Sequence, residues 1–319
     1  MKKFFIMGMA AMGLALTACN NDETVEVAKG NAIGFNSFVN NSTRANDATN
    51  DNFTSFKVWG LMNKGEKTGT PFVGVNVTKA NGTWSYGTPP VYWEKGYAYS
   101  FVALAPNDAY TFTAPTAINT WGSLTFDNKT GETDLLYATQ KQGAVEGNTC
   151  PNAVNMTFNH MLSRVRFQFK NGMDDGSKLT VTDVKITDAY TNGTATLAED
   201  FNALTWTTET TTGNLAFDDA ETVGFAQSEV CTTGHKYMIP AEKAYNVTFT
   251  VTREYNGVTD SYNHNVTLPV TTMTQGLSYQ FVAEFTSNNI DPDNELCPIK
   301  FTATVNDWKT FDDNSFNLK

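Results

Sequence analysis

Apolar and polar residues alternate along most of this chain, with the two-residue period of β-strands. In the segment AIGFNSFV (32–39), one face carries Ile33, Phe35, Ser37 and Val39. Comparable runs follow in FTSFKVWGLM (53–62), in 71–78, in YAYSFVAL (97–104) and in LLYATQK near Leu135. Segments rich in Asn, Gly and Pro, such as KANGTW and YGTPP, separate these runs. The pattern predicts short strands joined by tight turns.

The second half of the chain shows the same pattern. In NMTFNHMLSRVRFQFK, the apolar residues Val165, Phe167 and Phe169 alternate with polar ones. Further strands are predicted in LTVTDVKITDAY, HKYMIPA, YNVTFTVTREYNGVTDSYNHNVTLPV and LSYQFVAEF. The Asn-Gly pair in EYNGVT suits the type I′ turn of a hairpin. We find no convincing helical period over a long segment and no βαβ rhythm, so the sequence predicts an all-β protein with a β-sandwich in each half.

A polar, loop-like stretch near residues 143–151 suggests a boundary between the two halves. We therefore predict an N-terminal β-sandwich domain over 31–150 and a C-terminal one over 151–319.

The last strand of the pattern resembles the first. In CPIKFTATVNDW, one face carries Ile299, Phe301, Ala303 and Val305, at the spacing of the inward residues of 32–39. One hypothesis is that both strands can fill a similar groove. The alternative is that each is an ordinary half-buried strand of its own domain, and alternation alone does not choose between them.

Composition narrows the class of protein. The chain has 319 residues, of which 40% are hydrophobic and 13% aromatic, enough to build cores. Its charged residues amount to only 17%, and its net charge is −11. Without a basic stripe to meet phosphates, the chain is not expected to bind nucleic acid.

The N-terminus predicts export. Met1-Lys2-Lys3 is followed by an apolar stretch from Phe4 to Leu16 and by LTAC, which ends at Cys19. This is the architecture of a signal peptide, which we place at 1–18, with a polar tether at 19–30. LTAC resembles the bacterial lipobox, which implies a lipid on Cys19 and attachment to the outer membrane. The alternative is an ordinary secretory peptide with an incidental cysteine.

Candidate chemistry is sparse. The histidines His160, His235 and His264 show no metal-ligand spacing, and no motif of a catalytic nucleophile is present. We therefore expect no catalytic residues, no metal and no cofactor. Three cysteines follow Cys19, namely Cys150, Cys231 and Cys297, and sequence does not choose a disulfide among them.

One arginine stands out. The chain has four arginines, and Arg44 lies in FVNNSTRANDAT, a run of small polar residues after the first predicted strand. It is either a solvated loop charge or the site of an arginine-specific protease, which needs a mobile segment with a basic side chain.

Several segments occur in a fixed order along the chain. They are the lipobox, the IGF strand ending in STRA, and the segments YWEKGYAYSFVALAP, MTFNHMLSRVRFQF, GLSYQFVAEF and VNDW. Together they resemble the fimbrillin family, the type V pilins of Bacteroides-type bacteria and their relatives. The resemblance spans essentially the whole mature chain, and its ordered series of short motifs carries it.

The resemblance implies two tandem transthyretin-like β-sandwiches and a precursor that reaches the cell surface as an outer-membrane lipoprotein. An arginine-specific protease would then cut between Arg44 and Ala45. The cut would displace the first strand with Ile33, Phe35 and Val39, and a C-terminal strand of another fimbrial subunit would fill the groove. Here Ile299, Phe301, Ala303 and Val305 mark the candidate donor strand.

Other functions stay open at this point. A shaft, anchor or tip role, and a ligand on a host or bacterial surface, are all compatible with the sequence. The rival hypothesis is a monomeric surface lipoprotein that binds glycans through exposed Tyr and Trp, some of the six tryptophans forming a platform for sugar rings.

Overall fold

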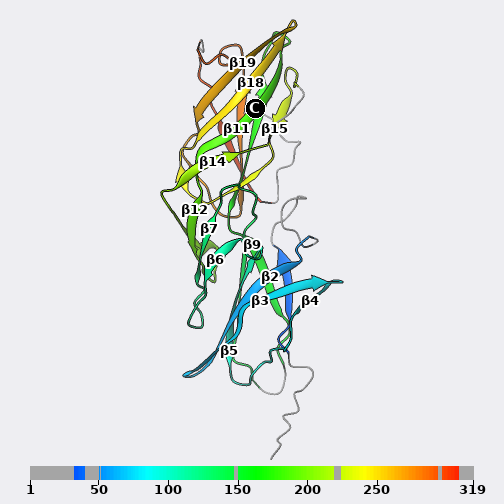
Figure 1. The fold of residues 1–319 in the computed structure, drawn as a ribbon, viewed down its shortest axis with the longest axis vertical. Coiled ribbons are helices and arrows are strands. Elements are labelled where there is room, and N and C mark those ends of the chain that lie inside the picture. The colour runs from blue at the N-terminus through cyan, green and yellow to red at the C-terminus, as the bar shows by residue number, and fades with distance from the viewer. Residues whose placement is uncertain are drawn as a thin grey trace, which may run out of the picture.

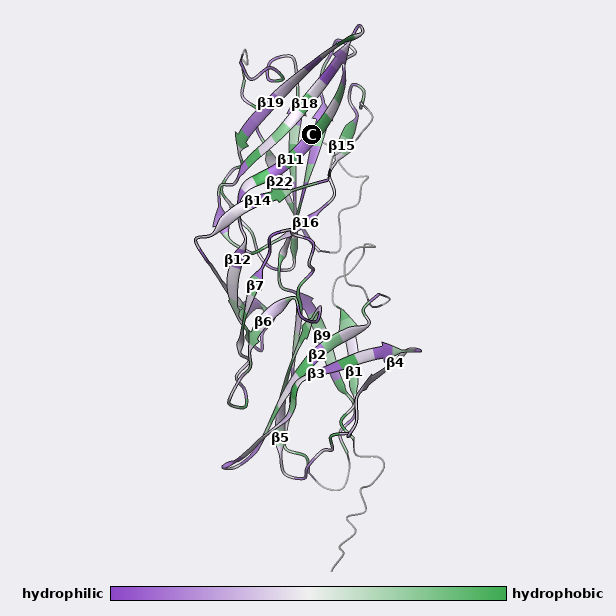
Figure 2. Ribbon diagram, viewed as in Figure 1, coloured by the Kyte–Doolittle hydropathy of each residue, from purple (hydrophilic) through white to green (hydrophobic). Residues whose placement is uncertain are grey.

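Strands form nearly all the regular structure in the computed structural model, which describes residues 32–39, 50, 52–146, 150–218, 224–293 and 297–308. Within these ranges one short 3₁₀ turn, η1 (Phe201–Ala203), is the only helical element. The molecule is elongated, with a seven-stranded sheet at one end, two sheets packed together at the other and a four-stranded sheet between them (Figure 1). Green and purple segments alternate along its strands in Figure 2, as the sequence pattern predicted. The all-β prediction is confirmed.

A seven-stranded sheet forms the lower part of the molecule, in the order β1-β9-β8-β5-β2-β3-β4. Neighbouring strands are antiparallel except β1 and β9, which run parallel. The sheet curls, so that its two outermost strands meet, with the rings of Phe35 and Tyr86 5.9 Å apart. The strands are β1 (Phe35–Val39), β2 (Ser55–Lys64), β3 (Lys67–Ala80), β4 (Thr83–Tyr86), β5 (Ala98–Ala105), β8 (Leu136–Gln142) and β9 (Val154–His160).

A four-stranded sheet in the middle covers the outer face of β5 and β8. Phe101 and Ala103 point into the lower core, whereas Val102 and Leu104 point into the middle core. This explains why β5 reads as an almost continuous apolar run, since both of its faces are buried. The strands, in the order β13-β12-β7-β6, are β6 (Tyr110–Thr113), β7 (Ser123–Asp127), β12 (Asn192–Thr196) and β13 (Thr205–Thr208).

Two sheets enclose the core of the upper part. One contains β10 (Ser163–Asn171), β15 (Val230–Thr232), β16 (Lys236–Met238), β21 (Leu277–Phe285) and the edge strand β22 (Thr302–Asp307). The other contains β11 (Lys178–Tyr190), β14 (Thr212–Ala216), β18 (Asn246–Tyr255) and β19 (Val258–Thr267). A small pair, β17 (Glu242–Lys243) and β20 (Thr271–Thr272), lies apart from both.

The predicted hairpin between β18 and β19 is present. Tyr255 pairs with Val258, and the two turn residues Asn256 and Gly257 have φ values of 49° and 78°. Both angles lie in the left-handed region that a type I′ turn requires.

The segment NMTFNHMLSRVRFQFK, which follows the predicted boundary at residue 150, forms two strands of different sheets. β9 pairs with β1 and β8 in the lower sheet, and β10 belongs to the upper part. The chain changes sheet at Met161 and Leu162, both fully buried in the middle core. An apolar crossing of this kind carries no turn signal that a sequence pattern would reveal.

Candidate functional site

The first strand fills a slot in the lower sheet. On one side β1 pairs in parallel with β9, from Phe35 opposite Val154 to Val39 opposite Phe158. On the other side the Ile33 N–H donates to the Val91 carbonyl over 2.8 Å, and the Tyr86 hydroxyl donates to the Ile33 carbonyl over 2.8 Å. Figure 2 shows β1 close to both β4 and β9. A strand held between two such flanks can be replaced by another extended segment, because these bonds use backbone atoms of β1.

Three side chains of this strand close the lower core. Ile33, Phe35 and Val39 have exposed fractions of 1%, 4% and 5%, as the alternation predicted. Phe38 points the opposite way and is 53% exposed. The strand therefore has one face that belongs to the core and one that faces solvent.

Tyr86 is held neutral at this slot. Burial raises the pKa of its hydroxyl, and the hydrogen bond from the Val91 N–H offsets only part of that effect. A protonated hydroxyl can donate to the Ile33 carbonyl, which a phenolate cannot. The sequence analysis did not identify Tyr86, because a half-buried tyrosine at a strand end has no distinctive pattern.

The end of β1 is tied to the chain that follows. The Val39 N–H donates to the side-chain oxygen of Asn50 over 2.8 Å. In the sequence, the expected cleavage site at Arg44 and Ala45 lies between these two residues, outside the described ranges. The expected lipid site at Cys19 also lies outside them.

The candidate donor strand does not behave as one uniform face. Ile299 and Phe301 are buried in the upper core, with exposed fractions of 4% and 6%. Ala303 is exposed, and Val305 is 47% exposed. The reason is position. Phe301, just before β22, packs against Phe249 of the facing sheet, whereas β22 itself is the edge strand next to β21.

The C-terminal strand ends at a strong anchor. Trp308 is fully buried in the middle core and stacks on His160 of β9, with ring centroids 4.2 Å apart and planes 12° apart. It also stacks on Tyr237 of β16, with ring centroids 5.7 Å apart and planes 6° apart. One indole ring thus joins a strand of the lower sheet to a strand of the upper part. The sequence analysis used VNDW only as a family motif and missed this role.

A buried arginine completes the anchor. Arg164 is 1% exposed, and its guanidinium lies 5.0 Å from the centre of the Trp308 ring. Its Nη2 donates to the Trp308 carbonyl over 2.7 Å, and its Nε donates to the Ser278 hydroxyl over 2.9 Å. A buried charge is tolerated only with such partners. The alternation in SRVRFQF predicts that Arg164 faces away from the upper core. It does not predict that this face is buried as well.

His160 has a structural role at the same place. Its Nδ1 lies 2.8 Å from the Asp134 carboxylate, and its ring is 2% exposed. The hydrogen bond orients the imidazole for its stack on Trp308.

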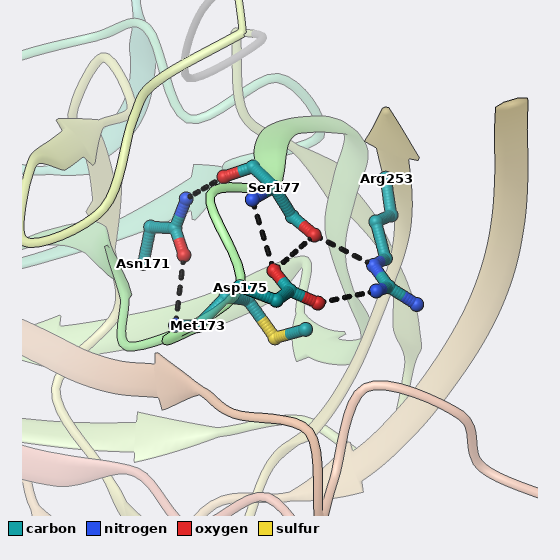
Figure 3. Close-up of polar contacts among 5 residues, drawn as sticks. All are labelled: Asn171, Met173, Asp175, Ser177 and Arg253. Atoms are coloured by element: carbon teal, nitrogen blue, oxygen red, sulfur yellow. Dashed lines mark hydrogen bonds and ion pairs between the residues drawn. The ribbon is translucent and has the colours of Figure 1, made fainter. Parts of the chain in front are cut away.

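A second polar cluster lies near the far end of the upper part, in the loop between β10 and β11 (Figure 3). The Asp175 carboxylate accepts a bond from the Ser177 N–H over 2.9 Å and pairs with Arg253 of β18 at 2.5 Å. Partial burial raises the pKa of Asp175, but the hydrogen bonds from Ser177 and the charge of Arg253 outweigh it. The pKa is therefore held below its usual value. The cluster fixes the loop between β10 and β11 to β18.

In the described ranges no group of His, Cys, Asp and Glu side chains is arranged to hold a metal ion. No helix in these ranges has the length and apolar character that a membrane crossing needs. Cys231 lies in the upper core and Cys150 packs against the lower one, so these two cysteines belong to different cores.

The tryptophans do not form a platform for sugar rings. All six lie in the described ranges, and each is buried or half-buried. The Trp206 indole N–H, for example, donates to the Met161 carbonyl over 2.9 Å. The part of the rival hypothesis that relies on exposed tryptophan is therefore not favoured, whereas its tyrosine part is untouched, since Tyr255 is 39% exposed.

Comparisons with known proteins agree with this architecture. The model of the fimbrillin-like family matches residues 43–308. A fimbrial protein from Bacteroides vulgatus ATCC 8482 has a similar structure, with a TM-score of 0.63 and 16% identity over 87% of this chain and 99% of that one. A protein from Bacteroides ovatus ATCC 8483, provisionally named a cell adhesion protein, has a TM-score of 0.52 and 14% identity over 88% of this chain and 99% of that one. A search of curated proteins found no match. Because the family model spans well over half of the sequence and the solved structures share its fold, the chain belongs to the fimbrillin-like family.

Proposed function

We propose that this protein is a structural subunit of surface fimbriae that assembles by strand exchange. It is exported as a lipoprotein through Cys19, reaches the outer membrane and is cut after Arg44. The cut frees β1, and a C-terminal segment of another subunit enters the slot between β9 and β4. Its partners are then other fimbrial subunits and an arginine-specific protease, and it performs no catalysis.

One observation carries the proposal. The first strand closes the lower core with three buried side chains, yet β1 is an outermost strand whose only ladder is the five-residue one with β9. Its other flank adds only the bonds of Ile33 to Val91 and Tyr86. The residues that join it to the rest of the chain include Arg44. A cut there leaves β1 attached by non-covalent contacts alone, which a competing strand can replace.

Loss of the first strand would expose apolar surface, so the empty slot would bind a new strand favourably. Ile33, Phe35 and Val39 are each worth about 1.5–3 kcal/mol when buried, so their loss leaves a groove that favours a new strand. The backbone groups of β9 would also lose their partners. When each subunit donates a strand to the next one, the contact is head-to-tail and produces open filaments rather than closed rings.

The donor segment has two candidates near the C-terminus. The strand with Ile299, Phe301, Ala303 and Val305 matches the spacing of β1. Releasing this strand would destabilise the upper core, because the Phe301 ring packs there against Phe167 and Phe249, at centroid distances of 5.6 Å and 6.0 Å. Residues 309–319, outside the described ranges, are the second candidate, because donation from there leaves the Trp308 anchor in place.

The test is limited digestion of the mature protein with an arginine-specific protease, followed by N-terminal sequencing and gel filtration. We expect a new terminus at Ala45, loss of the 19–44 fragment and a ladder of oligomers. Arg44→Gln is the matched control and should stay intact and monomeric. The proposal fails if the folded protein resists cleavage at Arg44, or if the cut protein keeps its first strand and stays monomeric in the presence of uncut subunits.

A further inference from the structure

The slot contains one site that is more selective than the rest. We infer that a donor strand is recognised by an aromatic side chain at the position of Phe35, which enters a socket formed by Phe56, Phe72, Tyr86 and Phe101. The donor is a segment of a second copy of this chain. This inference rests on the proposed strand exchange and adds the feature by which the slot selects its occupant.

The socket surrounds the Phe35 ring with edge-to-face contacts. The centroid distances are 6.2 Å to Phe56, 5.2 Å to Phe72, 5.9 Å to Tyr86 and 5.9 Å to Phe101, with planes 70–87° apart. This is the favourable geometry for aromatic pairs, because a ring edge meets the negative face of another ring. An aliphatic side chain offers no such edge.

The socket is built without the help of β1. Its four residues come from four different strands, β2, β3, β4 and β5. Phe56 is held by Trp84 of β4 at 5.2 Å, and the other three rings contact one another through Phe72. Phe72 lies 5.2 Å from Tyr86 and 6.1 Å from Phe101. Gly60 makes room for two of these rings, since a Cβ there would lie 2.9 Å from Phe72 and 3.2 Å from Phe101. The rings are therefore held in place when the first strand leaves.

The other positions of the slot discriminate less. Ile33 and Val39 are also buried, but aliphatic side chains of similar volume replace one another in a core at little cost. The main-chain N–H and carbonyl of residue 33 bond to the Val91 carbonyl and the Tyr86 hydroxyl, which any residue except proline can do. Ser37 is small and only partly buried. The pairing with β9 is likewise between backbones. Position 35 therefore contributes most of the selectivity of the slot between side chains.

Both candidate donor segments satisfy this requirement. The strand at 299–305 presents Phe301 two residues after Ile299 and four before Val305, which is the order found in β1. Residues 309–319 contain Phe311 and Phe316.

Peptide exchange tests the inference on the full-length chain. A cleavage site for a sequence-specific protease is inserted between residues 42 and 47, and the folded protein is nicked there. Labelled peptides of sequence 32–39 then compete with the bound first strand, and native mass spectrometry and fluorescence anisotropy measure their occupancy. The variants are Phe35→Tyr, Phe35→Leu and Phe35→Ala. Phe38→Ala is the matched control, because Phe38 is the exposed phenylalanine of the same strand.

We expect the native, Phe35→Tyr and Phe38→Ala peptides to bind similarly. Phe35→Leu should bind roughly tenfold more weakly and Phe35→Ala roughly a hundredfold more weakly. If the leucine and alanine peptides bind like the native one, the aromatic requirement is wrong and strand exchange stands. If no peptide, the native sequence included, replaces the first strand, the proposed function itself fails.

Discussion

Two aromatic residues near the two ends of the described chain hold their strands in place. Phe35 packs β1 into the lower core, and Trp308 packs the end of β22 into the middle core. Both contact rings from other strands, so their energy depends on the surrounding sheets and not on their neighbours in sequence. A strand that exchanges between molecules needs an anchor of this kind, because backbone pairing alone is not selective.

Asp175 gives a pH-dependent prediction at the residue scale. Its folded-state pKa lies below that of the unfolded chain, so its contribution is present above about pH 4 and is lost as the pH falls through the folded-state pKa. Asp175→Asn should lower the free energy of unfolding at pH 7 by about 0.5–1 kcal/mol. The difference from the native protein should shrink at pH 3.

Urea unfolding at both pH values checks this prediction. The neighbouring Asp174 is exposed and is the matched control, and Asp174→Asn should change stability little at either pH. A loss for Asp175→Asn that is equally large at pH 3 would mean that the ion pair with Arg253 is not its cause.

At the scale of elements, the strands of the lower sheet differ in how firmly they are held. β5 lies in the interior of the sheet and is buried on both faces, whereas β1 lies at the edge and is buried on one. The parallel pairing of β1 with β9 is also slightly weaker per residue than antiparallel pairing. The strand that we propose to be exchanged is therefore among the least constrained of its sheet.

Hydrogen exchange should report this order directly. Before any cleavage, amides of 35–39 should exchange faster than amides of 99–104, because local opening releases the edge strand without disturbing the sheet. Exchange followed by mass spectrometry on the intact mature protein measures both segments at once. Equal protection of the two segments would show that β1 opens only with the whole sheet, which argues against a replaceable strand.

At the scale of the whole molecule, the middle core couples the two ends. It combines Leu104 of the lower sheet, Met161 at the crossing between sheets, Tyr237 of the upper part and Trp308 of the C-terminal strand. In the filament that we propose, a subunit would carry load along its length, and a shared core would hold its two ends together more rigidly than a flexible linker.

Removing the indole ring should lower the stability of the protein and uncouple the unfolding of its two ends. Trp308→Ala leaves a cavity beside His160 and Arg164 and should cost about 3–5 kcal/mol of unfolding free energy. It should also split the thermal transition into two steps. Val305→Ala, in the same strand but half exposed, is the matched control and should change stability by less than about 1 kcal/mol. Differential scanning calorimetry distinguishes a split transition from a uniform shift, and an unsplit transition would mean that other contacts couple the two parts.

Much of the fold follows from local sequence pattern. Alternation identified the long strands and the buried face of Ile33, Phe35 and Val39, and the Asn-Gly pair identified the turn at Asn256 and Gly257. The structure confirms these features. Strand pattern succeeds here because side chains point to alternate faces of a strand whatever its neighbours are.

Tertiary structure alone decided which strands lie together. The parallel pairing of β1 with β9, the crossing at Met161 and Leu162, and the ring stack of Trp308 on His160 join residues about 120–150 positions apart, or switch sheets without a turn. Alternation also assigned Val305 the same inward face as Phe301, whereas the edge position of β22 leaves Val305 exposed. A strand's own sequence records which of its faces is apolar, but burial depends on what packs against that face, and only the folded chain determines this.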